Sequence, residues 1–288
     1  MAVDPDVGAL TGMTVIYAGL DLEQAVDELA EAGFEAAEVF VGHLGPRVVE
    51  APVLEGHASA ARAVVERAGM TVSTLNCIVG YFDPFTSEET LEQTARGLAG
   101  HLRLGAAIGS PRVLIWDGEL EESALVTSAP PRLARLIERG RELSGLSFPP
   151  AITVELHPNT FAFKYRRHDE VAAALLGVDA GVCLDFCHAA VALGPRFAAD
   201  LDEGFVRAVR HVHFADSDGV SEQLHFPPGE GHVDIDGTLA LLKGRTLPCG
   251  WDLFGWPAPR HATAEGMARY RQAVASIAGA RTVSEPPR

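Results

Sequence analysis

Short apolar runs alternate with amphipathic stretches from one end of the chain to the other. The apolar runs predict strands over residues 13–18, 36–41, 71–78, 112–116, 151–156, 181–185, 210–215 and 250–254. The amphipathic stretches predict helices over residues 21–32, 55–68, 87–104, 131–143, 169–176, 199–209, 236–242 and 263–277. Such strict alternation indicates an α/β protein whose parallel strands are joined by right-handed crossovers.

Eight strand–helix units close naturally into a barrel, so the pattern predicts a single (β/α)₈ TIM-barrel domain over residues 1–288. We expect residues 1–10 and the tail 280–288 to be flexible. A doubly wound open sheet is the alternative architecture. That fold usually has a glycine-rich turn after its first strand, whereas this chain has Tyr17-Ala18-Gly19-Leu20 there.

Charge and cysteine content narrow the classes of partner and compartment. The chain has 39 acidic residues against 23 Lys and Arg, a net charge of −16. A surface this negative repels nucleic acid phosphates and anionic membranes, so we expect neither partner. The four cysteines form no C-x-x-C pair, and no signal-like segment or long apolar run is present, which favours a cytoplasmic protein. Apolar patches on the predicted outer helices are compatible with a homo-oligomer.

Polar residues gather where the fifth and sixth predicted strands end. The carboxyl ends of barrel strands and the loops after them build the site in this fold. The fifth strand ends in Glu155-Leu156-His157, and residues two apart share a strand face, so Glu155 and His157 are expected to point inward. The sixth strand ends in Asp185, with His188 three residues later. An Asp-x-x-His spacing gains meaning here because it directly follows an apolar strand.

The seventh and eighth predicted strands add an imidazole and a carboxylate. His211 and His213 share one strand face, and His213 lies nearer the carboxyl end. We therefore expect His213 in the site and His211 in the core. Asp252 lies between apolar neighbours in the eighth strand, where a carboxylate is costly unless it has a partner.

Glu155, Asp185, His213 and Asp252 together predict a site for one divalent metal ion. Three carboxylates and one imidazole suit Mn²⁺, which we expect first, with Mg²⁺, Co²⁺ and Zn²⁺ as alternatives. The competing interpretation is that Glu155 pairs with an Arg or Lys and that His213 is a hydrogen-bonded core residue. Five further residues are candidates for substrate contacts: His157, His188, Glu38, Trp116 and His232.

Five segments taken in order resemble the xylose isomerase-like TIM barrel superfamily, also called the sugar phosphate isomerase/epimerase family. They are VELHPN, CLDFCHA, HVHFADS, PPGEGHVD and WDLF, between residues 150 and 256. The resemblance implies that Glu155 is a metal ligand and a proton-transferring base. It also implies that Asp185 and His213 are ligands and that His188 contacts a substrate oxygen. Asp252 stands where the family usually has Glu.

Two departures limit what the resemblance implies. Ketose 3-epimerases of the family carry an Arg where this chain has Gly219, which counts against 3-epimerisation of a free ketose. The DNA-repair branch needs additional histidines on the third and fourth strands. Those strands end here in Asn76-Cys77 and Trp116-Asp117, so that branch is set aside.

We therefore expect a metal-dependent isomerase or epimerase that acts on a small polyhydroxylated carbonyl compound through an enediolate. Glu155 would remove a carbon-bound proton, and Asp252 would return it from the opposite face. A metal-dependent lyase, either a dehydratase or a deglycosylating enzyme, uses the same set of groups and stays open. A non-catalytic barrel whose metal site is degraded through Asp252 is the third alternative.

Overall fold

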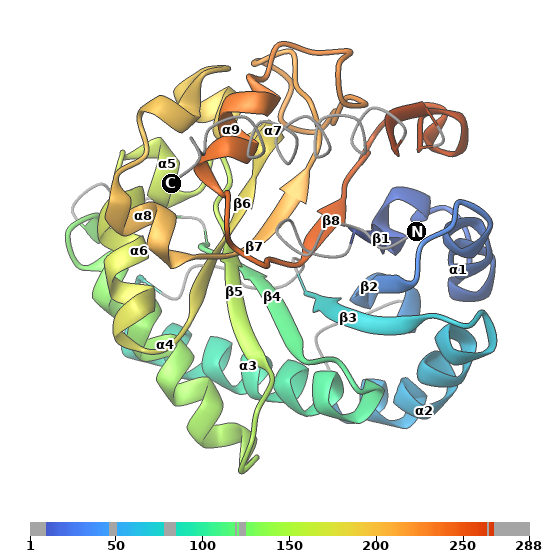
Figure 1. Cartoon of the computed structure of the whole chain (residues 1–288). Helices are drawn as coiled ribbons and strands as arrows, with labels where there is room; N and C mark the ends of the chain where they lie inside the picture. The colour runs from blue at the N-terminus through green and yellow to red at the C-terminus, as the bar shows by residue number, and fades with distance from the viewer. Residues whose placement is uncertain are drawn as a thin grey trace, which may run out of the picture.

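The strands form a closed barrel with the helices wrapped around it (Figure 1). The computed structural model describes residues 10–45, 51–77, 85–118, 120, 125–263 and 265–267. Each strand pairs in parallel with the next, and β8 pairs in parallel with β1 to close the ring. The strands are β1 Leu10–Met13, β2 Ala36–Phe40, β3 Thr71–Asn76, β4 Arg112–Trp116, β5 Ala151–Glu155, β6 Gly181–Asp185, β7 Val209–Phe214 and β8 Cys249–Trp251. The predicted (β/α)₈ architecture is confirmed.

The helices lie outside the barrel or in the loops beyond its strands. Those that overlap the predicted helices are α1 Leu22–Glu31, α2 Ala51–Arg67, α3 Glu88–Ile108, α4 Ala129–Ser144, α6 His168–Gly177, α8 Glu203–Ala208 and α9 Ile235–Leu241. Two further helices were not predicted from the sequence pattern: α5 Phe161–Lys164, which follows β5 after a short loop, and α7 Phe186–Leu193, directly after β6. Within the described chain, no helix combines the length and hydropathy that a membrane crossing requires.

Local sequence signals explain where several helices begin. The Asp21 side chain accepts a hydrogen bond from Gln24 N (2.9 Å), and the Gln24 side chain accepts one from Asp21 N (3.2 Å). This reciprocal capping box satisfies backbone donors that the first turn of α1 leaves open. Ser87 and Thr90 make the same arrangement at the start of α3. Both starts agree with the predicted ranges.

The first strand lies earlier than predicted. Residues 13–18 were expected to form it, but β1 spans Leu10–Met13, and Thr14–Tyr17 form a 3₁₀ helix. A short apolar run indicates burial without distinguishing a strand from a helical turn, and most residues of this turn are indeed buried. At Gly12 a Cβ would lie 2.6 Å from a Leu29 methyl carbon, so α1 packs closely against this strand and a larger residue would displace the Leu29 side chain.

Two other predicted helices differ from the structure. The range 199–209 contains α8, which begins after Asp202 accepts a hydrogen bond from Phe205 N (2.5 Å) and ends where β7 starts. A separate 3₁₀ turn, Phe197–Ala199, precedes it. Of the predicted helix 263–277, residues 263 and 265–267 are helical, and the others lie outside the described residues. The predictions of flexibility for residues 1–9 and 280–288, and of strand at residue 78, also fall outside them.

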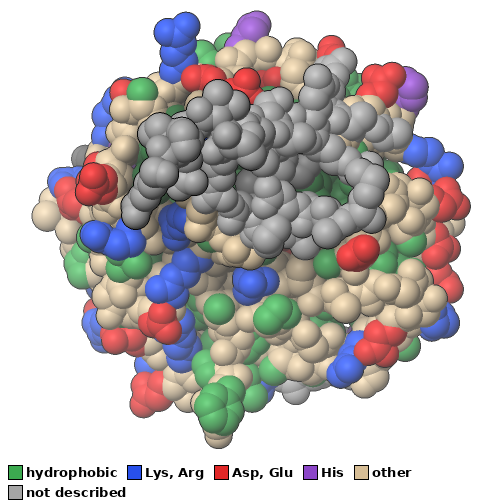
Figure 2. Space-filling model, in the orientation of Figure 1, with side chains coloured by type: hydrophobic (Ala, Val, Ile, Leu, Met, Phe, Trp, Pro, Cys, Tyr) green, Lys and Arg blue, Asp and Glu red, His purple; other side chains and the backbone are tan. Residues whose placement is uncertain are grey.

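Several charged side chains on the outer surface form ion pairs with one another. Figure 2 shows acidic and basic side chains interspersed around the periphery of one face. Between α3 and α4, Arg132 and Arg135 contact Glu88, and Arg139 makes two hydrogen bonds to Glu92 (2.8 and 3.0 Å). These exposed pairs contrast with the charged residues inside the barrel mouth.

Candidate metal centre

The carboxyl ends of β5 to β8 bring four predicted side chains to one point. One ligand atom each from Glu155, Asp185, His213 and Asp252 lies within 4.8 Å of the other three. His213 Nδ1 is 3.1 Å from Glu155 Oε1, 3.6 Å from Asp185 Oδ2 and 3.7 Å from Asp252 Oδ2. All four residues are buried. Although Asp252 has one methylene fewer than Glu, its carboxylate still reaches the cluster.

Strand register and helix capping hold these side chains in place. Asp185 is the last residue of β6 and pairs in register with His213 of β7. Its Oδ1 caps helix α7 by accepting a hydrogen bond from His188 N (2.7 Å). Asp252 Oδ1 accepts a hydrogen bond from Phe254 N (2.9 Å). In each aspartate one oxygen is bound to backbone, which leaves Oδ2 directed at the cluster.

Two carboxylate oxygens of this cluster lack, within the described chain, a partner that a bound cation would provide. Glu155 Oε2 and Asp185 Oδ2 are buried and have no hydrogen-bond partner among the residues that the structure describes. A buried carboxylate oxygen without a partner is costly, and a divalent cation would satisfy both oxygens at once. Oxygen and imidazole donors suit Mn²⁺, Mg²⁺, Co²⁺ or Zn²⁺ and do not single out one of them. The cluster can therefore hold a metal whose identity the donor set leaves open.

Histidines beside the cluster stabilise the ionised carboxylates. Burial alone would raise the pKa of Glu155, but His213, His188 and His157 hold that pKa well below its usual range. Burial would likewise raise the pKa of Asp185, and the nearby His188 and His225 lower it instead. Ionised oxygens are the form that binds a metal ion.

Three more histidines line the space above the cluster. His188 Nδ1 lies 3.3 Å from Glu155 Oε1, and His225 Nδ1 lies 3.1 Å from Asp252 Oδ2. The His157 ring stacks between Trp116 and His188, with ring centroids 4.3 and 3.7 Å away. Burial, followed by the nearby His188, lowers the pKa of His157 to about 3, so this ring is neutral at neutral pH. The predicted contact residues His157, His188 and Trp116 thus border one space.

His225 is a site residue that the sequence analysis missed. It lies in the long loop after β7, and Asp216 holds that loop by accepting hydrogen bonds from four backbone N–H groups: those of Ser217, Gly229, Gly231 and Val233. The motif PPGEGHVD drew attention to His232 instead. His232 is exposed, does not line the cavity, and its Nδ1 lies 3.4 Å from the carbonyl oxygen of Asp218. The histidine of this loop that faces the cluster is His225, and the predicted substrate contact of His232 stays a prediction.

Glu38, also a predicted substrate contact, lies outside the cavity lining. It lies below the cluster inside the barrel, where it is 1% exposed and does not line the cavity. Its carboxylate lies 3.1 Å from His211 Nε2 and 3.2 Å from His213 Nε2, and it accepts a hydrogen bond from Asn76 Nδ2 (2.6 Å). The structure therefore places Glu38 behind His213 and outside the cavity lining, and its predicted contact with substrate stays a prediction.

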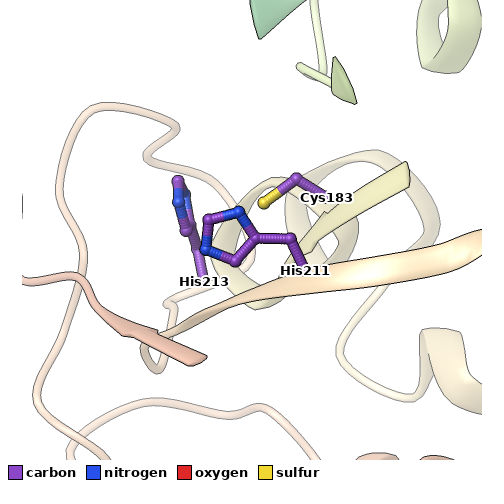
Figure 3. Close-up of side chains that lie close together, drawn as sticks. All are labelled: Cys183, His211 and His213. Carbon is purple, nitrogen blue, oxygen red and sulfur yellow. The ribbon is translucent and has the colours of Figure 1, made fainter. Parts of the chain in front are cut away.

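Cys183 lies beside the two histidines of β7. Figure 3 shows its sulfur and the rings of His211 and His213 close together between β6 and β7. Burial raises the pKa of the Cys183 thiol far above its ordinary value. Cys183 is buried, and its sulfur and one nitrogen of each histidine lie within 4.8 Å of one another.

A cavity of about 190 Å³ opens directly above the cluster. Glu155, His213 and Asp252 form part of its lining, together with the three histidines. The remaining wall is largely apolar and contains Met13, Val15, Phe40, Trp116 and Phe254. Drug-sized ligands occupy roughly 300–1,000 Å³. The smaller volume here favours a compact ligand with one polar edge and one apolar face.

Comparison with known proteins agrees with this architecture. The family model described as xylose isomerase-like TIM barrel matches residues 26–273. A comparison with curated proteins gave no match. Among solved structures, a xylose isomerase-like TIM barrel/4-hydroxyphenylpyruvate dioxygenase fusion protein is similar, with 21% identity and a TM-score of 0.67. That match covers 97% of this chain and 45% of the fusion protein, so the chain spans less than half of that relative.

Two other solved structures match over nearly their whole length. An IolI protein with a bound zinc atom shares 15% identity at a TM-score of 0.69, covering 94% of this chain and 98% of the other. The 3-keto-D-glucoside 4-epimerase YcjR from E. coli shares 13% identity at a TM-score of 0.67, covering 92% and 99%. Identities this low show a common fold and do not indicate a common reaction.

Proposed function

Because the chain belongs to the xylose isomerase-like TIM barrel family, we propose that it is a divalent-metal-dependent isomerase or epimerase acting on a small polyhydroxylated carbonyl compound. One observation carries the proposal. Three buried carboxylates and one imidazole converge within 4.8 Å at the floor of a cavity formed by the carboxyl ends of the barrel strands. This is the position where barrel enzymes have their active sites.

The proposed chemistry is proton transfer at a carbon next to a carbonyl group. A divalent cation supplies Lewis-acid polarisation of that carbonyl when it is bound. Glu155 removes the carbon-bound proton, because its Oε2 is buried, lies in the cavity floor and lacks a hydrogen-bond partner among the described residues. Asp252 reaches the same point from the end of β8 and, in its protonated form, donates its own proton to the other face of that carbon, which inverts it while Glu155 keeps the proton it removed. Delivery of the Glu155 proton to the former carbonyl carbon, with the hydroxyl proton moving between the two oxygens, gives isomerisation.

The cavity walls suit a ring with one polar edge. Neutral His157 both donates and accepts hydrogen bonds, so it can bind a substrate hydroxyl. Trp116 offers an aromatic surface beside it for the apolar face of a ring. The E. coli relative named as a 3-keto-D-glucoside 4-epimerase supports a keto sugar as the substrate class. Gly219, in place of the arginine of ketose 3-epimerases, counts against a free ketose.

Solvent deuterium exchange tests this proposal directly. A panel of keto sugars and ketoglycosides is incubated in D₂O with the full chain and Mn²⁺, and carbon-bound deuterium is followed by NMR. We expect metal-dependent exchange at one carbon of at least one compound. Glu155→Gln, measured at Mn²⁺ concentrations shown by titration to saturate it, should lower the exchange rate by about 10² to 10⁴.

A matched variant and two outcomes complete the experiment. Glu203→Gln removes an exposed carboxylate in α8 that is not part of the cluster, so it should leave the exchange unchanged. Unchanged exchange in metal-loaded Glu155→Gln would remove Glu155 as the base. Release of water or of a sugar, instead of exchange alone, would assign the protein to the lyases.

A further inference from the structure

We infer that Glu38 is a positioning residue that fixes the His213 ring so that Nδ1 faces the metal site. The inference rests on the proposed function, since it concerns the orientation of one of the proposed ligands. Glu38 comes from β2, on the opposite side of the barrel from the motifs of β5 to β8. It does not line the cavity, and it contacts the four-residue cluster through His213, so its effect has to pass through that ring.

The two ring nitrogens of His213 face different partners. Nε2 lies 3.2 Å from Glu38 Oε1, and Nδ1 lies 3.1 Å from Glu155 Oε1. A neutral imidazole carries one N–H donor and one lone pair. When Nε2 donates its hydrogen to Glu38, the lone pair is on Nδ1, the atom nearest the three carboxylates of the cluster. A carboxylate behind a ligating histidine commonly fixes ring orientation and tautomer in this way.

Glu38 is itself held in one orientation. Asn76 Nδ2 donates a hydrogen bond to Oε1 (2.6 Å), and His211 Nε2 lies 3.1 Å from Oε2. His211 Nδ1 in turn lies 3.5 Å from the hydroxyl of Thr153. These side chains are all buried, so water does not compete with their contacts. The carboxylate thus spans two histidines and has little freedom to turn away from His213.

A purely structural role for Glu38 makes a different prediction. If the carboxylate only filled the barrel, the isosteric Glu38→Gln would lower stability without changing the metal site selectively. The positioning role requires the charged acceptor, because a neutral amide holds the Nε2–H less strongly. Thr74 provides the matched control. It is fully buried, pairs in register with Glu38 on the neighbouring strand β3, and Thr74→Val preserves its shape.

Titration with Mn²⁺ alone, by calorimetry on the full chain, is the first measurement. We expect Glu38→Gln to weaken Mn²⁺ binding by about 10- to 100-fold, the usual effect of losing such a supporting group. Thr74→Val should bind Mn²⁺ as the wild-type protein does. Equal affinities for wild-type protein and Glu38→Gln would overturn the inference and leave the proposed function intact. Absence of Mn²⁺ binding to the wild-type protein would overturn both.

The tautomer of His213 provides a second test. It is measured on the wild-type protein and so does not depend on whether a variant folds. Long-range ¹H–¹⁵N NMR correlations on the Zn²⁺-loaded wild-type protein report which ring nitrogen carries hydrogen. We expect hydrogen on Nε2 and metal on Nδ1. Hydrogen on Nδ1 would contradict the inference, even if Glu38→Gln proved too unstable to study.

Discussion

Two groups of charged side chains in this molecule have opposite surroundings. Between α3 and α4, Glu92 and Arg139 are each about one-third exposed and pair through two hydrogen bonds. At the barrel mouth, Glu155 and Asp185 are almost fully buried, and each keeps an oxygen without a hydrogen-bond partner in the described part of the chain. The outer charges are satisfied where they lie. The inner carboxylates are satisfied at one oxygen each, although burial makes the other oxygen, which has no partner in that part of the chain, far more costly.

This difference separates side chains that support the fold from side chains that serve a ligand. Exposed ion pairs contribute little to stability because water screens them and two long side chains lose freedom. Several carboxylates buried together lower stability unless a cation compensates them. The mouth cluster is able to hold a metal, and equivalent substitutions in the two groups should therefore have different effects.

The largest expected effect is loss of metal affinity in Asp185→Asn. This change removes one charge from the cluster and keeps the helix cap, because Asn caps helices as well as Asp does. We expect Mn²⁺ affinity to fall by at least about 10²-fold, beyond the usual loss of a supporting group. The melting temperature of the metal-free protein should fall at pH 7, because the nearby His188 and His225 lower the pKa of Asp185 against burial and so stabilise its ionised form in the folded state. Calorimetric titration and thermal unfolding with and without Mn²⁺ measure both.

Asp202→Asn is the matched control for that variant. Asp202 also caps a helix, α8, but it is exposed and lies outside the cluster. It should change neither Mn²⁺ affinity nor the stabilisation that Mn²⁺ gives. A metal affinity that survives Asp185→Asn, or falls equally in Asp202→Asn, would contradict the assignment of Asp185 to the cluster.

A smaller effect is expected for His211→Ala, and it should appear in stability. His211 is completely buried beside Glu38, so its removal leaves a cavity and a carboxylate with one partner fewer. Breaking a buried pair typically costs about 3–5 kcal/mol. We expect a loss of about that size in the free energy of unfolding from denaturant titration, with Mn²⁺ affinity reduced less than in Glu38→Gln. The reverse order would mean that His211 acts in the metal site.

The smallest effect is expected for Glu92→Gln on the outer surface. Hydrogen bonds from Arg139 hold the pKa of Glu92 below its ordinary value of 4.5. A carboxylate whose pKa is lower in the folded state stabilises the protein above the unfolded pKa, and this contribution disappears as the pH falls through the folded pKa. Glu92→Gln should therefore lower the melting temperature slightly at pH 7 and not at all well below pH 4. A difference that grows on acidification would refute this sign.

The sequence predicted the strands that carry the cluster better than the loops around it. The barrel and the inward positions of Glu155, Asp185 and His213 follow from strand periodicity, which is a local property. Asp252 was anticipated because a carboxylate among apolar neighbours is unusual. The shifted β1 shows the limit of this reasoning, since burial of residues 14–17 is compatible with a 3₁₀ turn as well as with a strand.

His225 and Glu38 depend on long-range contacts that no local pattern contains. The position of His225 is set by a loop that folds around the buried Asp216 carboxylate. Unlike a strand or helix, this loop has no periodic pattern of apolar residues from which its path could be predicted. Glu38 was expected at the end of the second strand, but it lies in the middle of β2. Its place beneath His213 depends on how far each side chain extends across the barrel, which becomes known only when β2 and β7 are both positioned.

The convergence of four side chains on one cation is most directly tested by a crystal structure of the full chain soaked with Mn²⁺. The account predicts one anomalous peak at the cavity floor, within about 2.0–2.4 Å of oxygens from Glu155, Asp185 and Asp252 and of His213 Nδ1. A peak elsewhere, or no peak at Mn²⁺ concentrations well above the measured dissociation constant, would contradict it.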